Sequence, residues 1–333
     1  MHALITGGAG FIGSHLTEHL VGRGWTVTAL DDLSTGSLAN LEPVRRGPHR
    51  DAVDFVGGQV TDLSLVRELM EPADVVFHLA AAVGVLTIQQ QTLQSMRTNL
   101  AGTETVLEAA LQSGTTVLFT STSEVYGKNT TEGLTEESDR IMGSPLLSRW
   151  SYAEAKAIDE TLVQQYHLHH GLPTVIVRLF NTTGPRQSGR YGMVLPRFVQ
   201  QAIAGEPLTV YGDGTQTRCF GHVLDVVPMI AALPRIASAH GQVFNIGNPE
   251  QVSINDLAER VIQRTGSSSP VVHVDYETAY GQGYEDMERR VPDCSRLHDL
   301  TGFAPVFHLD DIIDSVHGQY LDRRPVAPLA VPA

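Results

Sequence analysis

Short apolar runs alternate with amphipathic stretches through the first half of this chain. The runs typical of buried strands are residues 2–6, Trp25–Leu30, Val53–Val56, Val75–Leu79, Thr116–Thr120 and Thr174–Arg178. Between them, helical patterns extend to about Gly22 and cover Leu63–Met70, Gln89–Ser113 and Tyr152–His169. Nearly continuous apolar strands that alternate with helices are typical of a parallel sheet covered on both faces. We therefore predict a Rossmann-like, doubly wound α/β fold.

The pattern changes after Arg178. Residues 181–222 are rich in glycine, proline, arginine and aromatic residues. A strand at Gln242–Ile246 is predicted to return to the sheet, and a helix at Ser253–Gly266 is predicted to begin with Ser253 as its N-cap. We therefore expect residues 1–178 to form a Rossmann domain and residues 179–333 to form a smaller α/β domain that binds the substrate.

A glycine-rich turn follows the first predicted strand. Gly7, Gly10 and Gly13 are spaced by three residues at the start of a helix, where glycine lets a dinucleotide pyrophosphate approach the backbone. The next strand ends in Asp31 and Asp32, and a carboxylate there accepts hydrogen bonds from an adenosine ribose. It would repel a 2′-phosphate, so the pattern favours NAD over NADP. The alternative role of Asp32 is to cap the following loop.

Two further strand ends carry small or hydroxyl-bearing residues. Residues 80–82 are all alanine, which either lets a cofactor lie close to the chain or serves close helix packing. Residues 121–124 are Ser-Thr-Ser-Glu, and a hydroxyl there is placed to bridge a sugar oxygen to a catalytic group. The alternative is that these hydroxyls bond their own loop. The sequence leaves three roles possible for Glu124: a sugar contact, a proton-transfer group or a solvated loop acid.

Tyr152 and Lys156 lie four residues apart in a predicted helix, so they share one face of it. The ammonium group, together with a cationic nicotinamide ring, would favour the phenolate over the phenol. Lowering a tyrosine pKa from about 10 to about 7 requires about 4 kcal/mol of differential stabilisation. The spacing predicts that Tyr152 is a general base with a lowered pKa, although the same spacing also arises by chance in many helices.

Composition and charge limit the partners of the protein. Of 333 residues, 23 are lysine or arginine and 37 are aspartate or glutamate, giving a net charge of −14. Such a charge disfavours nucleic acid and anionic membranes. The arginines that gather after residue 181 nevertheless indicate recognition of a diphosphate.

The distribution of cysteine and apolar residues adds expectations about the compartment. Cys219 and Cys294 are the two cysteines and form no metal-spaced cluster, which predicts a reducing cytoplasm and no metal site. The sequence has no run of 18 apolar residues, and Met1 leads directly into a predicted strand. We therefore expect neither a membrane span nor a signal peptide.

Eight ordered motifs together resemble the extended short-chain dehydrogenase/reductase family, in particular its nucleotide-sugar epimerases, dehydratases and decarboxylases. They are GGAGFIG at 7–13, DDLSTG at 31–36, HLAA at 78–81, TSTSEVYG at 120–127, YAEAK at 152–156, FNTTGPRQ at 180–187, LTVYGDGTQTR at 208–218 and RRVPD at 289–293. The resemblance covers residues 1 to about 320. It implies that NAD binds in the first domain and a UDP-sugar in the second. It also implies a homodimer formed through the helices near Gln89–Ser113 and Tyr152–His169.

The resemblance assigns roles to single residues. Tyr152 takes the proton of a sugar hydroxyl, Lys156 holds the nicotinamide ribose, and Thr122 assists, with Ser123 and Glu124 beside it. The implied cofactor contacts are Gly7, Gly10, Phe11, Ile12, Gly13, Asp31, Asp32, Gln59, Val60, Leu79, Ala80, Ala81, Tyr152 and Lys156. The implied substrate contacts are Asn181, Arg218 and Arg290 at the diphosphate, and Leu208 and Tyr211 near the uridine. Relatives often carry aspartate at the position of Gln59, so the adenine contact there departs from their pattern.

Two fates of a 4-keto sugar compete once hydride has left carbon 4 for NAD. A 4-epimerase returns hydride to the other face, whereas a uronate decarboxylase first lets the keto acid lose carbon dioxide. TSEVYG with Glu124 resembles UDP-glucuronate decarboxylases, but YAEAK, GPRQ and the loop at 189–193 look more like 4-epimerases. We predict a UDP-glucuronate 4-epimerase first, a UDP-xylose-forming decarboxylase second and a UDP-glucose 4-epimerase third. Arg190 is the candidate for the uronate carboxylate, or else a diphosphate contact or an exposed loop residue. An inactive NAD-sensing protein of this fold would typically lack Tyr152 or Lys156.

Overall fold

A parallel sheet forms the larger part of the computed structural model, which describes residues 1–82, 91–189, 192–280 and 285–321. Seven described strands build this sheet: β1 (His2–Thr6), β2 (Thr26–Asp31), β3 (Val53–Gly57), β4 (Val75–His78), β5 (Thr116–Thr122), β6 (Thr174–Leu179) and β11 (Gln242–Ile246). Their order is β11-β6-β5-β4-β1-β2-β3. The order reverses between β1 and β4, and in such sheets ligands bind beyond the carboxyl ends of the strands at that point. The doubly wound α/β fold that the sequence predicts is confirmed.

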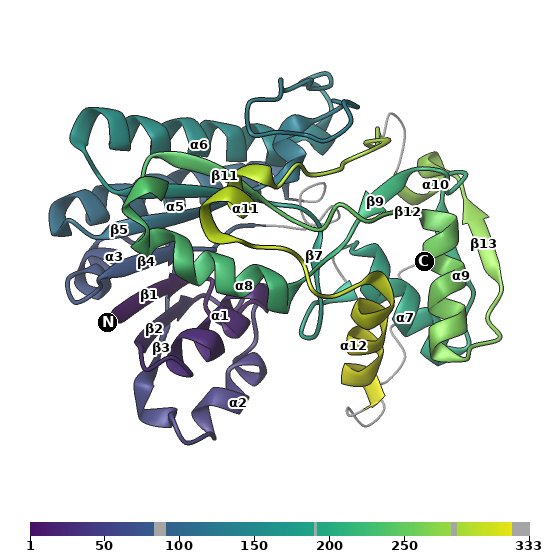
Figure 1. Ribbon diagram of the computed structural model, residues 1–333, viewed down its shortest axis with the longest axis horizontal. Helices are drawn as coiled ribbons and strands as arrows, with labels where there is room; N and C mark the ends of the chain where they lie inside the picture. The colour runs from purple at the N-terminus through teal and green to yellow at the C-terminus, as the bar shows by residue number, and fades with distance from the viewer. Residues whose placement is uncertain (83–90, 190–191, 281–284, 322–333) are drawn as a thin grey trace.

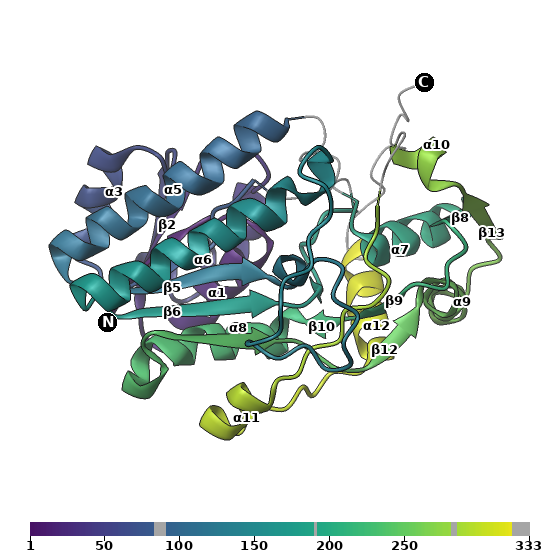
Figure 2. The ribbon, with the colours of Figure 1, turned by 90° about the horizontal axis from the view of Figure 1, so that it is seen from above.

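Helices cover both faces of the sheet (Figures 1 and 2). Helices α1 (Phe11–Val21) and α8 (Val223–Ala232) pack on one face, and α3 (Leu63–Met70), α5 (Thr92–Ser113) and α6 (Ser151–His170) pack on the other. Because successive strand residues point to opposite faces, Ala3 and Ile5 join the first core while Leu4 joins the second. Both faces bury apolar residues, which explains why the strands are apolar without alternation.

A smaller part packs beside the carboxyl ends of the strands (Figure 1). Helices α7 (Val194–Ala204), α9 (Ile254–Thr265) and α12 (Leu309–Leu321) enclose a third apolar core with β8 (Leu208–Tyr211). Strand β8 pairs in parallel with β13 (Val271–Val274), β9 (Thr217–Cys219) pairs antiparallel with β12 (Gln251–Ser253), and β7 (Thr182–Thr183) pairs in parallel with β10 (Gly221–His222). The Ser253 hydroxyl caps α9 by accepting a hydrogen bond from the Asp256 amide at 3.0 Å, which confirms the predicted N-cap.

Short elements complete the described chain. They are η1 (Leu38–Asn40), α2 (Glu42–Arg45), η2 (Arg50–Ala52), η3 (Ser123–Tyr126), η4 (Ser148–Trp150), η6 (Leu233–Arg235), η7 (Ala237–Ala239), α10 (Tyr276–Tyr280) and α11 (Ser295–Thr301). Of these, η3 follows β5 and η4 leads into α6, so both lie at the strand ends where ligands bind.

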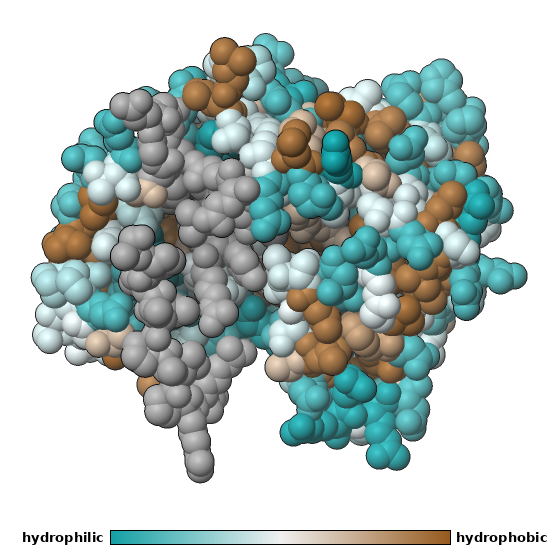
Figure 3. Space-filling view, turned by 180° about the vertical axis from the view of Figure 1, so that it is seen from behind, coloured by the Kyte–Doolittle hydropathy of each residue, from teal (hydrophilic) through white to brown (hydrophobic). Residues whose placement is uncertain are grey.

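The described surface gives no sign of a membrane segment or a metal cluster. On the face shown in Figure 3, hydrophobic residues form small groups among hydrophilic ones. None of the described helices is both long and apolar enough to span a bilayer. Nor do the described histidine, cysteine, aspartate and glutamate side chains gather into groups of three or more that would hold a metal ion.

Candidate active site

A cavity of about 940 Å³ runs along the carboxyl ends of the strands. One wall comes from the loops after β1, β2, β3, β4 and β5, and the facing wall comes from the smaller part of the molecule. All of the implied cofactor contacts line it: Gly7, Gly10, Phe11, Ile12, Gly13, Asp31, Asp32, Gln59, Val60, Leu79, Ala80, Ala81, Tyr152 and Lys156. Thr122, Ser123, Glu124, Asn181, Tyr211, Arg218 and Arg290 line it as well. The fold thus brings residues from both ends of the sequence to one concave site.

The glycine-rich turn forms a cradle that side chains would fill. Gly7 has a φ of +73°, and a β-carbon there would lie 2.9 Å from the Ala80 backbone nitrogen. A β-carbon on Gly13 would lie 2.1 Å from the carbonyl oxygen of Gly7. Helix α1 begins directly after Gly10, whose backbone caps the helix without a side-chain hydrogen bond. The first backbone amides of α1 therefore face the cavity, as a pyrophosphate requires.

The two aspartates at the end of β2 have different surroundings. The Asp31 carboxylate accepts hydrogen bonds from the backbone amides of Ala9 at 3.0 Å and Leu33 at 2.8 Å, and burial raises its pKa. The hydrogen bond from Ala9 to Asp31 thus holds the glycine-rich turn against the end of β2. Asp32 is exposed to the cavity, and it accepts a hydrogen bond from the Ser34 amide at 2.9 Å. Asp32 therefore both caps the loop, the alternative that the sequence left open, and lies at the cavity.

Tyr152 and Lys156 lie on the first turns of α6 and both line the cavity. The Lys156 ammonium donates a hydrogen bond to the Thr120 carbonyl oxygen at 3.0 Å and lies 4.4 Å from the centre of the Phe119 ring. Burial lowers the pKa of Lys156 to about 8. An ammonium group has three donors, so this geometry leaves donors of Lys156 for a ribose or for Tyr152.

The pKa of Tyr152 differs in direction from the sequence prediction. Burial raises the pKa of this phenol well above its usual range, and the carboxylates of Glu124 and Asp159 raise it further. The prediction counted only the two cations, Lys156 and the nicotinamide ring. It missed the two acids because they approach from another loop and from the next turns of α6.

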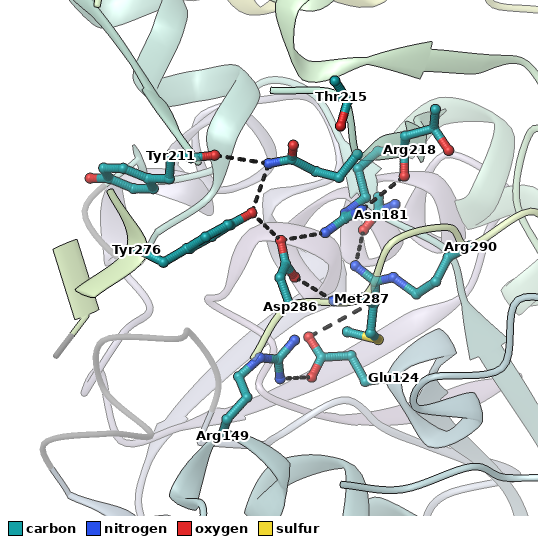
Figure 4. A network of polar contacts seen from close by, with 12 residues as sticks. Glu124, Arg149, Asn181, Tyr211, Thr215, Arg218, Tyr276, Asp286, Met287 and Arg290 are labelled. Carbon is teal, nitrogen blue, oxygen red and sulfur yellow. Dashed lines mark hydrogen bonds and ion pairs between the residues drawn. The ribbon is translucent and has the colours of Figure 1, made fainter. Parts of the chain in front are cut away.

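Glu124 is an ionised carboxylate held between two arginines (Figure 4). Its Oε2 accepts a hydrogen bond from Arg149 at 2.7 Å, and its Oε1 lies 4.0 Å from an Arg290 nitrogen. Burial alone would raise the pKa of Glu124, but Arg149 and Arg290 hold it below its usual value. Among the possibilities that the sequence left open, a solvated loop acid is therefore wrong. The hydroxyl of Thr122 accepts a hydrogen bond from the Glu124 amide at 3.2 Å and so fixes the turn.

The diphosphate candidates form a network beside Glu124 (Figure 4). Arg290 donates to the Asn181 side-chain oxygen at 3.2 Å and to the Ser123 hydroxyl at 3.1 Å. Its buried Nε has no hydrogen-bond partner among the described residues. Burial, together with neighbouring Arg218, lowers the pKa of Arg290 to about 10. A dianionic ligand would relieve both the unmade hydrogen bond and the crowding of positive charge.

Arg218 already has a carboxylate partner. It donates a hydrogen bond to Asp286 at 2.8 Å, and the Tyr276 hydroxyl donates to the same carboxylate oxygen at 3.0 Å. Gln216 donates in turn to the Tyr276 hydroxyl at 2.8 Å. The side chains of this network come from β9 and the residue before it, from α10 and from the segment after α10, so they are brought together only by the tertiary fold (Figure 4).

The remaining substrate candidates differ in where the structure places their side chains. The side chain of Leu208 is fully buried in the third core, and it is absent from the residues that line the cavity. Leu208 and Tyr211 are three positions apart on β8, so their side chains point to opposite faces of the strand. Tyr211 faces the cavity, where the Arg197 guanidinium lies 4.1 Å from its ring centre. Arg190 lies outside the described residues.

Comparison with known proteins assigns the chain to a family. The NAD dependent epimerase/dehydratase family matches residues 3–247. The chain is 43% identical to the UDP-N-acetyl-alpha-D-glucosaminuronate decarboxylase of Bacillus cytotoxicus, over 91% of this chain and 92% of the relative. It is 33% identical to UDP-glucuronic acid decarboxylase 1 of Arabidopsis thaliana, over 97% of this chain and 70% of the relative. This chain belongs to the NAD dependent epimerase/dehydratase family.

A solved structure extends the similarity to the whole fold. The UDP-glucuronic acid 4-epimerase of Bacillus cereus, in complex with UDP-glucuronic acid and NAD, superposes with a TM-score of 0.86 at 28% identity. The superposition covers 97% of this chain and 98% of the epimerase. NAD is the cofactor of this family member. The glycine cradle, the acidic end of β2 and the buried Lys156 fit that cofactor.

Several residues that line the cavity are not among the candidates that the sequence analysis singles out. Arg149 and Asp286 contribute charges, and Arg197, Gln216 and Tyr276 line the cavity around Tyr211. Arg149 stands three positions before Tyr152, and Asp286 stands four positions before Arg290. Their closeness to predicted site residues was a usable signal, but the sequence does not specify which way either side chain points.

Proposed function

We propose that this protein is a UDP-hexuronate decarboxylase that acts on UDP-N-acetylglucosaminuronate, with UDP-glucuronate as a related substrate. The 43% identity to the Bacillus cytotoxicus decarboxylase, against 28% to the Bacillus cereus 4-epimerase, supports this choice. The proposal reverses the order that the motifs predict, in which the 4-epimerase comes first. The motifs YAEAK and GPRQ are short, whereas the identity to the decarboxylase extends over nearly the whole chain.

The ionised Glu124 beside Tyr152 is the single observation that carries the proposal. Arg149 and Arg290 hold Glu124 in its charged form, and both guanidinium groups already face that carboxylate. A uronate carboxylate that enters this end of the cavity meets an anion whose countercharges are already engaged. Loss of carbon dioxide removes the second negative charge from that place, so the repulsion favours decarboxylation of the keto acid over its retention.

Individual side chains of this protein have distinct roles in the proposed reaction. Bound NAD supplies reversible hydride acceptance at carbon 4 of the sugar. Tyr152 takes the proton of the carbon 4 hydroxyl, and Lys156 stabilises the resulting phenolate. The carboxyl carbon then leaves carbon 5 as carbon dioxide, and the electron pair of the broken bond forms an enolate. The protonated Tyr152, with Thr122 beside it, donates a hydrogen bond to the enolate oxygen while carbon 5 takes a proton from water. Tyr152 then returns its own proton to the carbon 4 oxygen when that carbon is reduced again.

UDP-glucuronate 4-epimerase is the second candidate. It is supported by the similarity to the Bacillus cereus epimerase and by the family likeness of the loop at 189–193. The same Tyr152 and Lys156 chemistry serves it, but hydride returns to the opposite face while the carboxylate stays in place. Arg190 would then be the carboxylate ligand.

Product analysis distinguishes the two candidates. Purified protein is incubated with NAD and either UDP-N-acetylglucosaminuronate or UDP-glucuronate, and the products are followed by mass spectrometry and proton NMR. A product lighter by the mass of carbon dioxide is expected. An isomer of unchanged mass with inverted carbon 4 would refute decarboxylation and establish the epimerase.

The Glu124→Gln variant tests the role of the charge. Carbon dioxide release is expected to fall by about 100-fold, the usual scale for losing one electrostatic contact in an active site. Oxidation at carbon 4, measured as NADH formation, is expected to fall much less. Glu132→Gln is a matched control, because Glu132 is largely exposed and pairs with Arg289 at the surface. Equal losses of both steps in Glu124→Gln would contradict the proposed role.

The same proposal includes the arrangement of domains and subunits. Residues 1–178 would bind NAD and residues 179–333 the UDP-sugar, with β11 supplied by the second segment to the first. A homodimer through α5 and α6 is supported by Leu111, Ile158 and Leu168, which are apolar but exposed on these helices. The two free thiols are consistent with the reducing cytoplasm. Light scattering coupled to size-exclusion chromatography should give twice the 36.1 kDa mass of one chain, and an Ile158→Glu variant should give the mass of a monomer.

A further inference from the structure

Asp159 is a buried carboxylate for which the reaction has so far no use. It lies on α6 and is fully buried. Neither of its carboxylate oxygens has a hydrogen-bond partner of regular geometry among the described residues, although the Thr103 hydroxyl of α5 lies beside them. A buried, poorly bonded carboxylate is costly for a folded protein. A nearby cation should therefore offset this cost, or the carboxylate should have a functional role.

The nearby cation is Lys156. Tyr152, Lys156 and Asp159 follow one another at spacings of four and three residues along α6, so all three lie on one face of the helix. The charge of Asp159 opposes the effect of burial on Lys156, and Lys156 is the main group that stabilises the Asp159 carboxylate. The two buried groups thus influence each other's charge on the face of α6 that carries Tyr152.

The other titratable groups around Lys156 are engaged elsewhere or uncharged. Glu160, on the next position of α6, is held by Arg178 through two hydrogen bonds at 2.9 and 2.7 Å. His78 of β4 is fully enclosed, and burial lowers its pKa to about 3, so its ring is neutral. The Glu124 carboxylate faces Tyr152 from η3. Glu160 also supports the charged form of Lys156, but the effect of Asp159 is the larger of the two.

We propose that Asp159 is a positioning residue whose buried carboxylate keeps the Lys156 ammonium charged and in place, and thereby sets the pH range in which the enzyme works. The inference rests on the roles proposed for Tyr152 and Lys156, which decarboxylation and epimerisation share. Thr103 and His78 extend the contact to the sheet, because the Thr103 hydroxyl lies 3.3 Å from His78 Nε2. Asp159 touches neither the cofactor nor the substrate in this role.

The charge of Asp159 acts on both catalytic groups in the same direction. It supports the charged form of Lys156 and opposes the charged form of Tyr152. Asp159→Asn should therefore lower the pKa of Lys156 and the pKa of Tyr152 together. Both limbs of the pH–rate profile, which report the titration of this interacting pair, should move to lower pH. A purely structural defect would lower the rate without moving either limb.

The sequence offers a direct measurement, because Lys128 and Lys156 are the only lysines in the chain. Protein labelled with ¹³C at lysine should give two side-chain signals, and Lys128→Arg assigns them. In the unsubstituted protein, the Lys156 signal should titrate near pH 8, with a second inflection near pH 6 as Asp159 ionises. A Lys156 signal without the inflection near pH 6 would overturn the proposal without any variant.

Substitutions sharpen the test. In Asp159→Asn the Lys156 midpoint should move lower by about one pH unit, the lower end of the effect of a near charge, while the Lys128 midpoint stays in place. Asp159→Glu should restore it. Glu154→Gln is the matched control, because it removes one charge from the same helix at a position facing away from Lys156. An unmoved Lys156 midpoint in Asp159→Asn refutes the inference.

The proposed function and the proposed role of Asp159 can be refuted separately. The NMR titration needs neither substrate nor turnover. If the Lys156 midpoint moves as expected but no uronate is converted, the proposed function is refuted and the role of Asp159 stands. If uronates are decarboxylated but the Lys156 midpoint is unmoved in Asp159→Asn, the proposed function stands and the role of Asp159 is refuted.

Discussion

Asp159 should make the protein less stable at neutral pH than it would be with a neutral residue in its place. Burial raises the pKa of this carboxyl from 3.8 to about 6, while Lys156 lowers it in part. The folded state therefore binds the proton more tightly than the unfolded chain does. Between about pH 4 and pH 6 the unfolded chain ionises first, so stability is lost as the pH rises through this window.

The size of the loss follows from the two pKa values. With 3.8 for the unfolded chain and about 6 for the folded protein, the penalty at pH 7 is about 3 kcal/mol. The attraction of Lys156 is already contained in the folded value. At pH 5 the penalty is about half as large, because much of the folded population still holds the proton. Asp159→Asn removes this penalty. The net gain in stability is smaller than the penalty, because the asparagine side-chain amide must itself be buried.

The assay is equilibrium unfolding in urea at pH 7 and pH 5, followed by fluorescence and far-ultraviolet circular dichroism. Asp159→Asn is expected to unfold at higher urea at pH 7, with a gain of about 1–3 kcal/mol that shrinks at pH 5. Asp54→Asn is the control, because Asp54 is exposed on β3, and it should change stability by less than about 0.5 kcal/mol. A gain that is absent, or equal at both pH values, would refute the reasoning.

Three further predictions concern the cradle, the base and a buried ion pair. Gly13→Ala should weaken NAD binding, measured by calorimetry, at least about tenfold, because the added carbon would lie 2.1 Å from the Gly7 carbonyl oxygen; unchanged affinity would contradict the cradle. Tyr152→Phe should cut turnover by about 1,000-fold while NAD still binds, and full activity would exclude Tyr152 as the base. Glu160→Gln should cost about 3 kcal/mol of unfolding free energy, because it leaves the buried Arg178 without its countercharge; a loss under about 1 kcal/mol in a urea titration would show that Arg178 finds another partner.

The sequence by itself determined the parts that depend on local pattern. Runs of apolar residues fixed the strands of the sheet because a strand buried on both faces has few other solutions. Gly7 and Gly13 were identifiable because only glycine fits where the turn approaches the next strand. The spacing of Tyr152 and Lys156 placed them on one helix face, since that face follows from the helical repeat alone. These features need no knowledge of distant neighbours.

Only the tertiary structure decided the electrostatics and the facing of single side chains. Arg290 reaches Ser123 across 167 positions of sequence, and Arg149 meets Glu124 across 25. The direction of the pKa change at Tyr152 depends on such meetings, because burial and nearby carboxylates outweigh a charge inferred from spacing. The burial of the Leu208 side chain also depends on the tertiary fold, because the packing of α7 and α9 sets which face of β8 is buried. Sequence spacing constrains neighbours along an element, whereas charge and burial depend on everything that the fold brings near.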